Sequence, residues 1–297
     1  MAEAGNDVLL INRHPEQVNA IQAHGLVMCT PSGERTVHPR AAVDAQGQGH
    51  TDLVIVLVKS FHTAAAMQAA TALVGPDTVV LSLQNGLGHE EILADIVGRD
   101  HVLAGKTYVG GVMLSPGRII AGTHGKETYI GELDGRLTPR AQRIAETFNG
   151  SGLLTHVSDN IIGTMWDKLL VNVATGALSG ITRLNYGDLY KVASVKATAI
   201  AAVQEAMDVA RAHHVQLRST HAEAAWTKAA EGLPYEFKTS MLQSLEKSSI
   251  TEIDFINGAV VRYGERCGIP TPVNATLVAC IKGIESALFN SYTQTAS

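Results

Sequence analysis

Paired cysteines, an excess of basic charge and long apolar runs are all missing from this sequence of 297 residues. The three cysteines, Cys29, Cys267 and Cys280, lack C-x-x-C and Cys/His spacings, which excludes a disulfide framework and a zinc site and favours a reducing compartment. Lysine and arginine number 23 against 28 aspartates and glutamates, which gives a net charge of −5. Since this balance provides no electrostatic reason to bind a phosphate backbone, we expect no nucleic-acid partner.

Apolar segments of membrane length are missing as well. The first residues have no basic region and only four consecutive apolar residues, too few for a signal peptide or a membrane anchor. The longest apolar stretch, Ile161–Ile181, is interrupted by Asp167, Lys168 and Asn172, which argues against a membrane span. These features predict a cytoplasmic protein without a membrane partner.

The N-terminal half alternates short β-branched runs with segments of helical periodicity. The runs Leu53–Val58 and Thr78–Leu83 are apolar throughout, which is typical of parallel strands covered by helices on both faces. Short segments between glycines, Arg118–Ala121 and Thr128–Ile130, predict an antiparallel extension of the sheet. The other predicted strands are Val8–Ile11 and Val102–Val109, and the predicted helices are Pro15–Ala23, His62–Leu73 and Glu90–Val97.

Strand patterns stop after Thr155–Val157, and helical patterns follow. We therefore predict an α/β domain over residues 1–157 and an all-helical domain over residues 158–297, and two domains suit a chain about twice the ~150-residue common domain length. The helix at Val195 is compatible with packing inside its domain or across a homodimer. The predicted helices are Asn160–Ala177, Val195–His213, His221–Ala230, Thr251–Cys267 and Pro272–Leu288.

An α/β half followed by a helical half suggests a dinucleotide-binding enzyme, but no G-x-G-x-x-G motif is present. The nearest match, Asn85-Gly86-Leu87-Gly88, lacks the third glycine and is also compatible with a plain strand-to-helix turn. Ala2–Gly5 has the pattern of a last helical turn, so Val8–Ile11 is the strand whose end contacts the cofactor ribose. Arg13 follows this strand and suits a 2′-phosphate, which favours NADP over NAD; an exposed arginine without a role is the alternative.

Two polar residues interrupt the most apolar helical segment. Lys168 and Asn172 are four residues apart, so they lie one above the other on one face of a helix. Trp166, Leu169 and Val173 supply apolar positions on the remainder of that helix. The polar pair is compatible with the solvated stripe of an amphipathic helix or with a polar lining of a cleft.

Glu252 is predicted to lie on the helix Thr251–Cys267, on the face shared with Ile256 and Tyr263. Ser249 and Glu252 have the spacing of a capping box, which satisfies the first amides of a helix and requires no catalytic role. Near a desolvated lysine, the same carboxylate would keep the ammonium charged. The sequence leaves both interpretations open.

Taken together, these segments resemble the ketopantoate reductase (2-dehydropantoate 2-reductase) family. The resemblance covers the chain from about Gly5 to Lys282, with the matching pieces in family order and at family-like spacing. These pieces are Val58-Lys59, Gln84-Asn85-Gly86-Leu87-Gly88, Trp166-Asp167-Lys168-Leu169-Leu170-Val171-Asn172, Ser240-Met241-Leu242-Gln243 and Thr251-Glu252-Ile253-Asp254-Phe255-Ile256-Asn257-Gly258.

The resemblance implies a Rossmann domain, followed by a helical domain like that of 6-phosphogluconate dehydrogenase. It implies NADPH-dependent reduction of ketopantoate to pantoate, a step toward pantothenate and coenzyme A. Lys168 would be the proton donor, Asn172 and Ser240 would hold the substrate, and Asn85 would contact both substrate and cofactor. The chemistry of Lys168 agrees, because an ammonium can stabilise and protonate the alkoxide that forms when hydride reaches a ketone carbon.

On the cofactor side, the resemblance assigns Arg13, Lys59 and Glu252 to positions near NADPH. Gly111 falls where a backbone contact to the cofactor is usual in the family. No metal is implied.

Two departures from the family concern the substrate and the start of the chain. Gly176 and Tyr186 replace asparagines of well-studied members, so a different 2-oxo acid is an alternative substrate. The family's first strand, glycine-rich turn and most of a helix, about 20 residues, have no counterpart here, and we expect a start assigned too far downstream. A catalytically silent relative that serves as a dimerisation or small-acid-binding module is the alternative.

Overall fold

The computed structural model describes residues 1–123 and 125–295, with side chains described as far as residue 288. Two compact units make up the chain. An α/β unit comprises Met1–Gln84 and His89–Ile161, and a helical unit comprises Asn85–Gly88 and Ile162–Ser297. The four-residue segment Asn85–Gly88 thus belongs to the helical unit, although both of its neighbours in sequence belong to the α/β unit.

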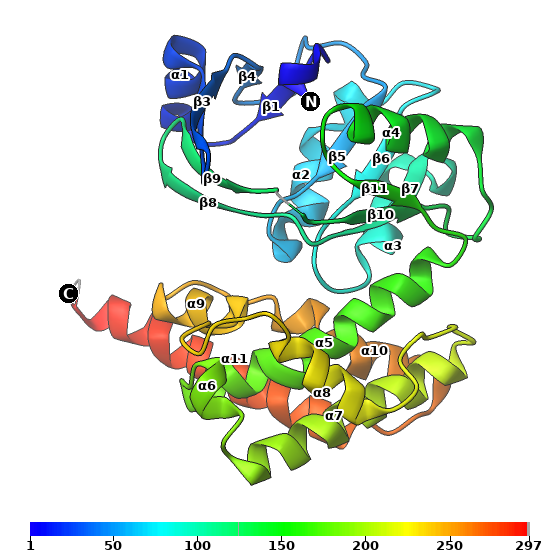
Figure 1. Cartoon of the computed structure of the whole chain (residues 1–297), viewed down its shortest axis with the longest axis vertical. Helices are drawn as coiled ribbons and strands as arrows, with labels where there is room; N and C mark the ends of the chain where they lie inside the picture. The colour runs from blue at the N-terminus through cyan, green and yellow to red at the C-terminus, as the bar shows by residue number, and fades with distance from the viewer. Residues whose placement is uncertain (124, 296–297) are drawn as a thin grey trace. The chain divides into compact units, whose positions relative to one another are not determined.

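A five-stranded sheet forms the centre of the α/β unit (Figure 1). The predicted strands at Leu53, Thr78 and Val102 are confirmed, and they run parallel to one another. The strand at Thr128 is antiparallel to the Val102 strand, as predicted, and pairs in parallel with the last strand. In spatial order the strands are β11 (Thr155–Val157), β10 (Thr128–Gly131), β7 (Val102–Thr107), β6 (Val79–Ser82) and β5 (Leu53–Val56).

Helices cover both faces of this sheet, as the continuous apolar strands require. Val80 on one face of β6 packs with Met67 of α2 (Thr63–Ala69) and Leu93 of α3 (His89–Val97). Leu81 on the other face packs with Phe148 of α4 (Pro139–Gly150). Helix α4 was not predicted; it begins with Pro139 in its first turn, and the Thr138 side chain caps it.

The remaining strands of the α/β unit form two smaller sheets. In the first, β1 (Leu9–Ile11) pairs in parallel with β4 (Arg40–Ala42), beside α1 (Pro15–His24). The second has the order β3 (Gly33–Val37), β2 (Leu26–Thr30), β9 (Arg118–Gly122) and β8 (Gly110–Ser115). The prediction that Arg118–Ala121 extends the main sheet is therefore wrong, because this strand pairs with β2 and β8 instead.

The turn at the start of the chain ends at Gly5, as predicted. Ala2–Ala4 forms a 3-10 turn that ends at Gly5 with φ 83°, a left-handed conformation that favours glycine. Three further 3-10 turns, Ser60–His62, Thr71–Leu73 and Arg99–His101, complete the α/β unit.

The helical unit confirms the predicted helices with one exception. The segment Thr251–Cys267 is not one helix, since a 3-10 turn, Ile253–Phe255, precedes α10, Asn257–Cys267. Ile256, with φ −106° and ψ −94°, separates the two. The other helices are α5 (Ile161–Thr182), α6 (Tyr186–Leu189), α7 (Ala193–Ala212), α8 (Ala222–Ala230), α9 (Ser240–Glu246) and α11 (Pro272–Thr295).

Within the described part of the chain, no helix is both long enough and apolar enough to span a membrane. The same residues contain no group of three or more His, Cys, Asp or Glu side chains placed to hold a metal ion.

Candidate active site

Helix α5 is held in place by contacts of the two residues that precede Lys168. Trp166 is 3% exposed and meets the ring of Tyr263 edge-on, with 5.8 Å between centroids. The carboxylate of Asp167 accepts hydrogen bonds from the backbone N–H groups of Arg218 and Ser219, both at 3.0 Å. These contacts set the rotation of the helix about its own axis and so decide where its remaining side chains lie.

Lys168 and Asn172 lie on the other face of α5, and both are half-buried. Leu169 and Leu170, between them in sequence, are fully buried in the interior of the helical unit. The half-buried side chains of Lys168 and Asn172 therefore do not fit the solvated stripe of an amphipathic helix well. The positions suit a polar lining that is partly withdrawn from water.

Glu252 lies at the start of the 3-10 turn Ile253–Phe255, and two interactions hold this turn on either side. The backbone N–H of Thr251 donates to a Glu285 carboxylate oxygen at 2.7 Å. Lys282 Nζ donates to an Asp254 carboxylate oxygen at 2.5 Å and lies 3.4 Å from Glu285. The position of the Glu252 backbone is thus fixed by charges on α11.

The capping-box interpretation of Glu252 is wrong. The 3-10 turn that follows Glu252 has no side-chain cap, and α10 begins only at Asn257. The Ser249 hydroxyl instead donates to the Lys247 carbonyl at 3.4 Å. The carboxylate of Glu252 is therefore not used as a helix cap, and its charge acts on Lys168 instead.

Two opposing effects set the pKa of Lys168. Burial lowers the pKa of its ammonium group to about 8, and the negative charge of Glu252 opposes this shift. A lysine in this range is still largely protonated near neutral pH, and it releases its proton more readily than an exposed lysine. These properties suit a general acid.

The segment Asn85–Gly88 packs directly on the Glu252 turn. Gly86 has φ 98°, and a Cβ built on it would lie 2.3 Å from the carbonyl oxygen of Phe255, so only glycine fits. The backbone N–H of Leu87 donates to the same carbonyl oxygen at 2.9 Å. Asn85 is therefore held beside the turn that carries Glu252, and the plain-turn interpretation does not account for this close approach.

Ser240 is the first residue of α9, where the Thr239 side chain caps the helix by accepting from the Leu242 N–H at 3.1 Å. Its side chain is exposed. The neighbouring Met241 is buried, and its Cε would lie 3.6 Å from a Cβ built on Gly176 of α5. The start of α9 therefore lies beside α5, one turn beyond Asn172.

Two of the predicted cofactor residues of the α/β unit, Arg13 and Lys59, lie just after strands. Arg13, after β1, is exposed, and its guanidinium lies 3.4 Å from ring nitrogens of His14 and His62. Lys59, also exposed, follows β5 and directly precedes the turn that carries His62. The structure thus brings the segments of Arg13 and Lys59 together around His62.

Gly111 occupies a different place in the α/β unit. It lies on β8, the edge strand of the four-stranded sheet, where it pairs with Ala121. All residues of β8 are exposed, so its backbone is accessible.

The donors around His62 fit an anionic group of a nucleotide. A guanidinium, an ammonium and imidazoles at the carboxyl ends of β1 and β5 match the chemistry of a phosphate.

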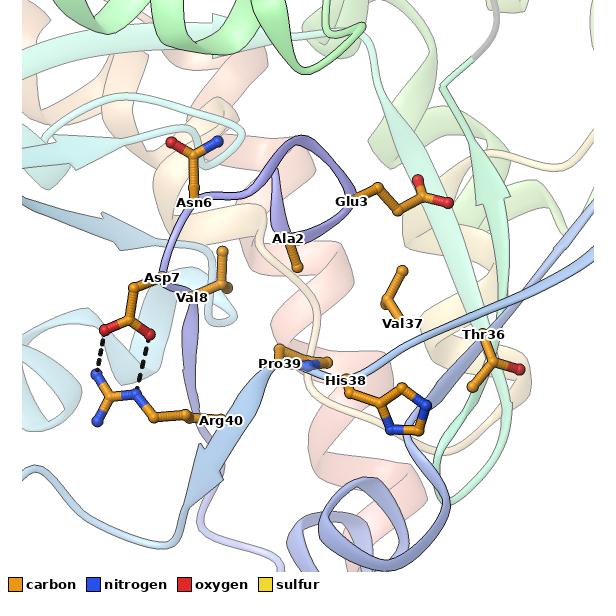
Figure 2. A pocket seen from close by; sticks show the side chains of 10 residues that line it. All are labelled: Ala2, Glu3, Asn6, Asp7, Val8, Thr36, Val37, His38, Pro39 and Arg40. Atoms are coloured by element: carbon orange, nitrogen blue, oxygen red, sulfur yellow. Dashed lines mark hydrogen bonds and ion pairs between the residues drawn. The ribbon is translucent and has the colours of Figure 1, made fainter.

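A separate hollow of about 400 Å³ lies between the first 3-10 turn and the segment from β3 to β4 (Figure 2). None of the predicted site residues lines it. The Arg40 guanidinium faces the Asp7 carboxylate there with two hydrogen bonds of 3.0 Å, so its charge is already compensated (Figure 2). The lining residues are Ala2, Glu3, Asn6, Asp7, Val8, Thr36, Val37, His38, Pro39 and Arg40.

Sequence reasoning missed the residues that support the site. Asp167 holds α5 in place through its hydrogen bonds to the backbone of Arg218 and Ser219. In the sequence, only its position next to Lys168 indicated that it could matter. Asn257, fully buried, donates to the Asn274 side chain at 3.0 Å, and Asn274 donates to Glu205 at 2.8 Å. This series of hydrogen bonds joins α10, α11 and α7. A buried asparagine in the segment Thr251–Gly258 was the available signal for it.

Family models describe both halves of the chain. The model "Ketopantoate reductase PanE/ApbA" matches residues 1–135, and its C-terminal counterpart matches residues 160–285. Both matches agree with the division into an α/β unit and a helical unit.

Curated relatives and solved structures agree with these matches. The chain is 33% identical over 286 residues to a 2-dehydropantoate 2-reductase of Archaeoglobus fulgidus, which covers 96% of this chain and 92% of the relative. It is 35% identical to a PanE/ApbA family ketopantoate reductase from Ralstonia eutropha, with a TM-score of 0.88 over 97% of this chain and 93% of the other.

A further solved structure, D-mandelate dehydrogenase with NADH and anilino(oxo)acetate, is 27% identical, with a TM-score of 0.86 over 96% of this chain and 93% of the other. These similarities confirm the predicted fold class, an α/β Rossmann-type domain followed by an all-helical domain. The chain belongs to the ketopantoate reductase family.

Proposed function

We propose that this chain reduces a 2-oxo acid with NADPH, and that 2-dehydropantoate, the compound named in its relatives, is its substrate. The observation that carries the proposal is Lys168, a half-buried ammonium with a pKa near 8 whose charge is maintained by Glu252. Such a group has no evident role in stabilising the helix that carries it. It is suited to proton transfer.

The roles of the residues follow from the charge that develops on the substrate. A carbonyl oxygen that becomes an alkoxide needs a donor within hydrogen-bond reach, and Lys168 provides both a positive charge and a proton. Asn172, one turn along the same face of α5, and Ser240, at the start of α9, provide neutral donors for the substrate carboxylate. The negative charge of Glu252 raises the pKa of Lys168 and so keeps its ammonium group protonated before the reaction.

NADPH, when bound, supplies the hydride. Arg13 would hold its 2′-phosphate, with Lys59 and His62 nearby, and the exposed backbone at Gly111 would make a further contact. Asn85, held on the Glu252 turn by Gly86, would contact both cofactor and substrate.

We further propose that the protein is cytoplasmic and that its only partner class is a small-molecule substrate. The three cysteines are free thiols in the structure, which suits a reducing compartment. We also propose a homodimer and no nucleic-acid partner. Gel filtration with light scattering tests the homodimer.

The full chain should oxidise NADPH when 2-dehydropantoate is added. A panel of other 2-oxo acids under the same conditions establishes whether the reaction class is right independently of this substrate. Saturable binding of NADPH, measured by calorimetry without substrate, separates a failure to bind cofactor from a failure of chemistry. An NADPH-bound protein that reduces none of the 2-oxo acids would contradict the proposal.

A further inference from the structure

The turn that follows Glu252 is only weakly stabilised by its own residues. The 3-10 turn Ile253–Phe255 has three residues and no side-chain cap, and its local support is a 3.2 Å hydrogen bond from the Ile253 N–H to the Thr251 hydroxyl. Ile256, which ends it, has φ −106° and ψ −94°, outside the common helical and extended regions. A turn this short holds its shape poorly by itself, so contacts from other elements fix its position.

Glu285 of α11 binds the start of this turn. Its side chain is 7% exposed, and one carboxylate oxygen accepts a hydrogen bond from the backbone N–H of Thr251 at 2.7 Å. Thr251 is itself buried and directly precedes Glu252. A buried carboxylate is costly to desolvate, and an apolar side chain of similar size fills the same space without that cost. The directed hydrogen bond therefore favours a role for Glu285 in fixing where Thr251 lies, beyond packing alone.

Lys282, one turn earlier on α11, binds the other end of the turn. Its Nζ donates to a carboxylate oxygen of Asp254 at 2.5 Å and lies 3.4 Å from the second Glu285 oxygen. Lys282 and Glu285 are three residues apart, so they lie on one face of α11. Glu252 lies between the two contact points in sequence, and its backbone is held from both sides.

The effect of Glu252 on Lys168 depends on where the carboxylate lies. Burial favours the neutral form of the Lys168 side chain, and the negative charge of Glu252 opposes it. Coulombic attraction weakens with distance, and it weakens further when a carboxylate moves into water. Contacts that fix the Glu252 backbone therefore control how strongly its charge acts on Lys168.

We propose that Glu285 and Lys282 are positioning residues: they hold the turn so that the Glu252 carboxylate stays near Lys168, and they thereby keep the ammonium group of Lys168 charged. The meaning of this inference for catalysis rests on the proposed function, in which Lys168 is the proton donor. Neither residue of α11 needs to contact substrate or cofactor for this role.

The test titrates Lys168 itself, by NMR of the full chain with ¹³C-labelled lysine and without substrate or NADPH. The Lys168 signal is assigned by its absence from Lys168→Met. In Glu285→Ala the pKa of Lys168 should fall by about 1, as in Glu252→Gln, because Glu252 loses its position. Glu285→Gln keeps an oxygen that accepts from Thr251, so its fall should be less than half as large. Glu285→Ala combined with Glu252→Gln should match Glu252→Gln alone, because both changes remove one interaction.

Lys282→Met separates position from charge by the sign of the change. Loss of a positive charge would by itself raise the pKa of Lys168, because a nearby like charge lowers the pKa of an ammonium group. If Lys282 acts by holding Asp254, the turn moves and the pKa of Lys168 should fall instead, by about 0.5. Glu223→Ala breaks an exposed ion pair with Lys196 in the same unit and is the control, with no change expected.

Three results would overturn the inference: an unchanged pKa of Lys168 in Glu285→Ala, equal falls in Glu285→Ala and Glu285→Gln, or a rise in Lys282→Met. An additive fall in the double variant would do so as well. Circular dichroism establishes which variants are folded, and Lys282→Met, at a side chain that is 41% exposed, decides the inference if Glu285→Ala does not fold. The titration requires no turnover, so its outcome is separate from that of the 2-oxo acid assay, which tests the proposed function.

Discussion

Lys168 of the helical unit and Glu90 of the α/β unit are displaced by burial in the same sense, each toward its neutral form. Burial lowers the pKa of Lys168 to about 8 and raises the pKa of Glu90 to about 7. Their neighbours differ. The carboxylate of Glu252 favours the charged form of Lys168, whereas Glu91 adds a like charge that further favours the neutral form of Glu90.

The difference separates the proposed proton donor from a buried carboxyl group for which no catalytic role is proposed. Lys168 is half-buried, on a face shared with Asn172, and retains a partner of opposite charge. Glu90 is 8% exposed at the start of α3, within the packed α/β unit. A displaced pKa alone therefore does not identify a catalytic residue; the sign of the nearest charge and the access to solvent are needed as well.

The largest expected effect is the loss of turnover in Lys168→Ala. Without the ammonium group, the developing alkoxide has no charged donor, and kcat should fall by about 10³-fold. Steady-state kinetics measures the loss, and an unchanged melting temperature shows that the fold is intact. Lys196→Ala, at an exposed ion pair on α7, is the control and should retain normal kcat. Near-normal turnover in Lys168→Ala would remove the distinction between the two groups.

Glu90→Gln tests the other side of the comparison. Because the folded pKa, about 7, is above the ordinary value of 4.5, the folded state binds the proton more tightly, and stability declines as pH rises from about 4.5 to about 7. The neutral amide avoids this loss, worth about 3 kcal/mol. The melting temperature of the variant should match wild type near pH 5 and exceed it at pH 8. Glu146→Gln, exposed on α4, should show no such pH dependence, and kcat should be preserved in both.

Arg13→Ala examines a third kind of ionic group, one that is exposed and predicted to bind rather than react. Loss of the 2′-phosphate contact should raise KM for NADPH by about tenfold. KM for NADH, which lacks this phosphate, should not change. Arg143→Ala on α4 is a matched control of the same charge. Equal effects on both cofactors would exclude a contact between Arg13 and the 2′-phosphate.

The smallest effect is expected for Glu252→Gln, which sharpens the comparison by removing the favourable charge beside Lys168. Since the proton donor must be charged, kcat/KM should decline as pH rises through about 8 in the wild type. Without the carboxylate, the pKa of Lys168 falls further, and the decline should move about one unit toward lower pH. A pH profile measures it, with Glu265→Gln on the exposed side of α10 as control. An unchanged profile would show that Glu252 does not act on Lys168.

Local patterns predicted most of the helices and strands, because periodicity depends on neighbours in sequence. Leu53–Val56 and Val79–Ser82 are continuous apolar strands buried by helices, and the sequence indicated both. The partners of β9 depend on contacts with β2, about 90 residues away in sequence. No local pattern contains that information, so the predicted extension of the main sheet was wrong.

The candidate site was likewise predictable only where local sequence patterns determine its structure. The common face of Lys168 and Asn172 follows from helical spacing alone. The break at Ile256 does not, because a continuous helical pattern over Thr251–Cys267 contains no proline or glycine at that point. The interactions of Lys282 and Glu285 with the Glu252 turn cross about 30 residues and fix a conformation that local preference does not favour.

The segment Asn85–Gly88 makes the two units inseparable by a single cut. The chain passes from one unit to the other at three peptide bonds, after Gln84, Gly88 and Ile161. Cleavage after Ile161 would yield a helical fragment without Leu87, leaving the carbonyl oxygen of Phe255 without the amide it accepts. The helical unit is therefore discontinuous in sequence. When the protein is expressed as two halves divided after Ile161, the N-terminal half carries Asn85–Gly88, a segment that belongs to the helical unit.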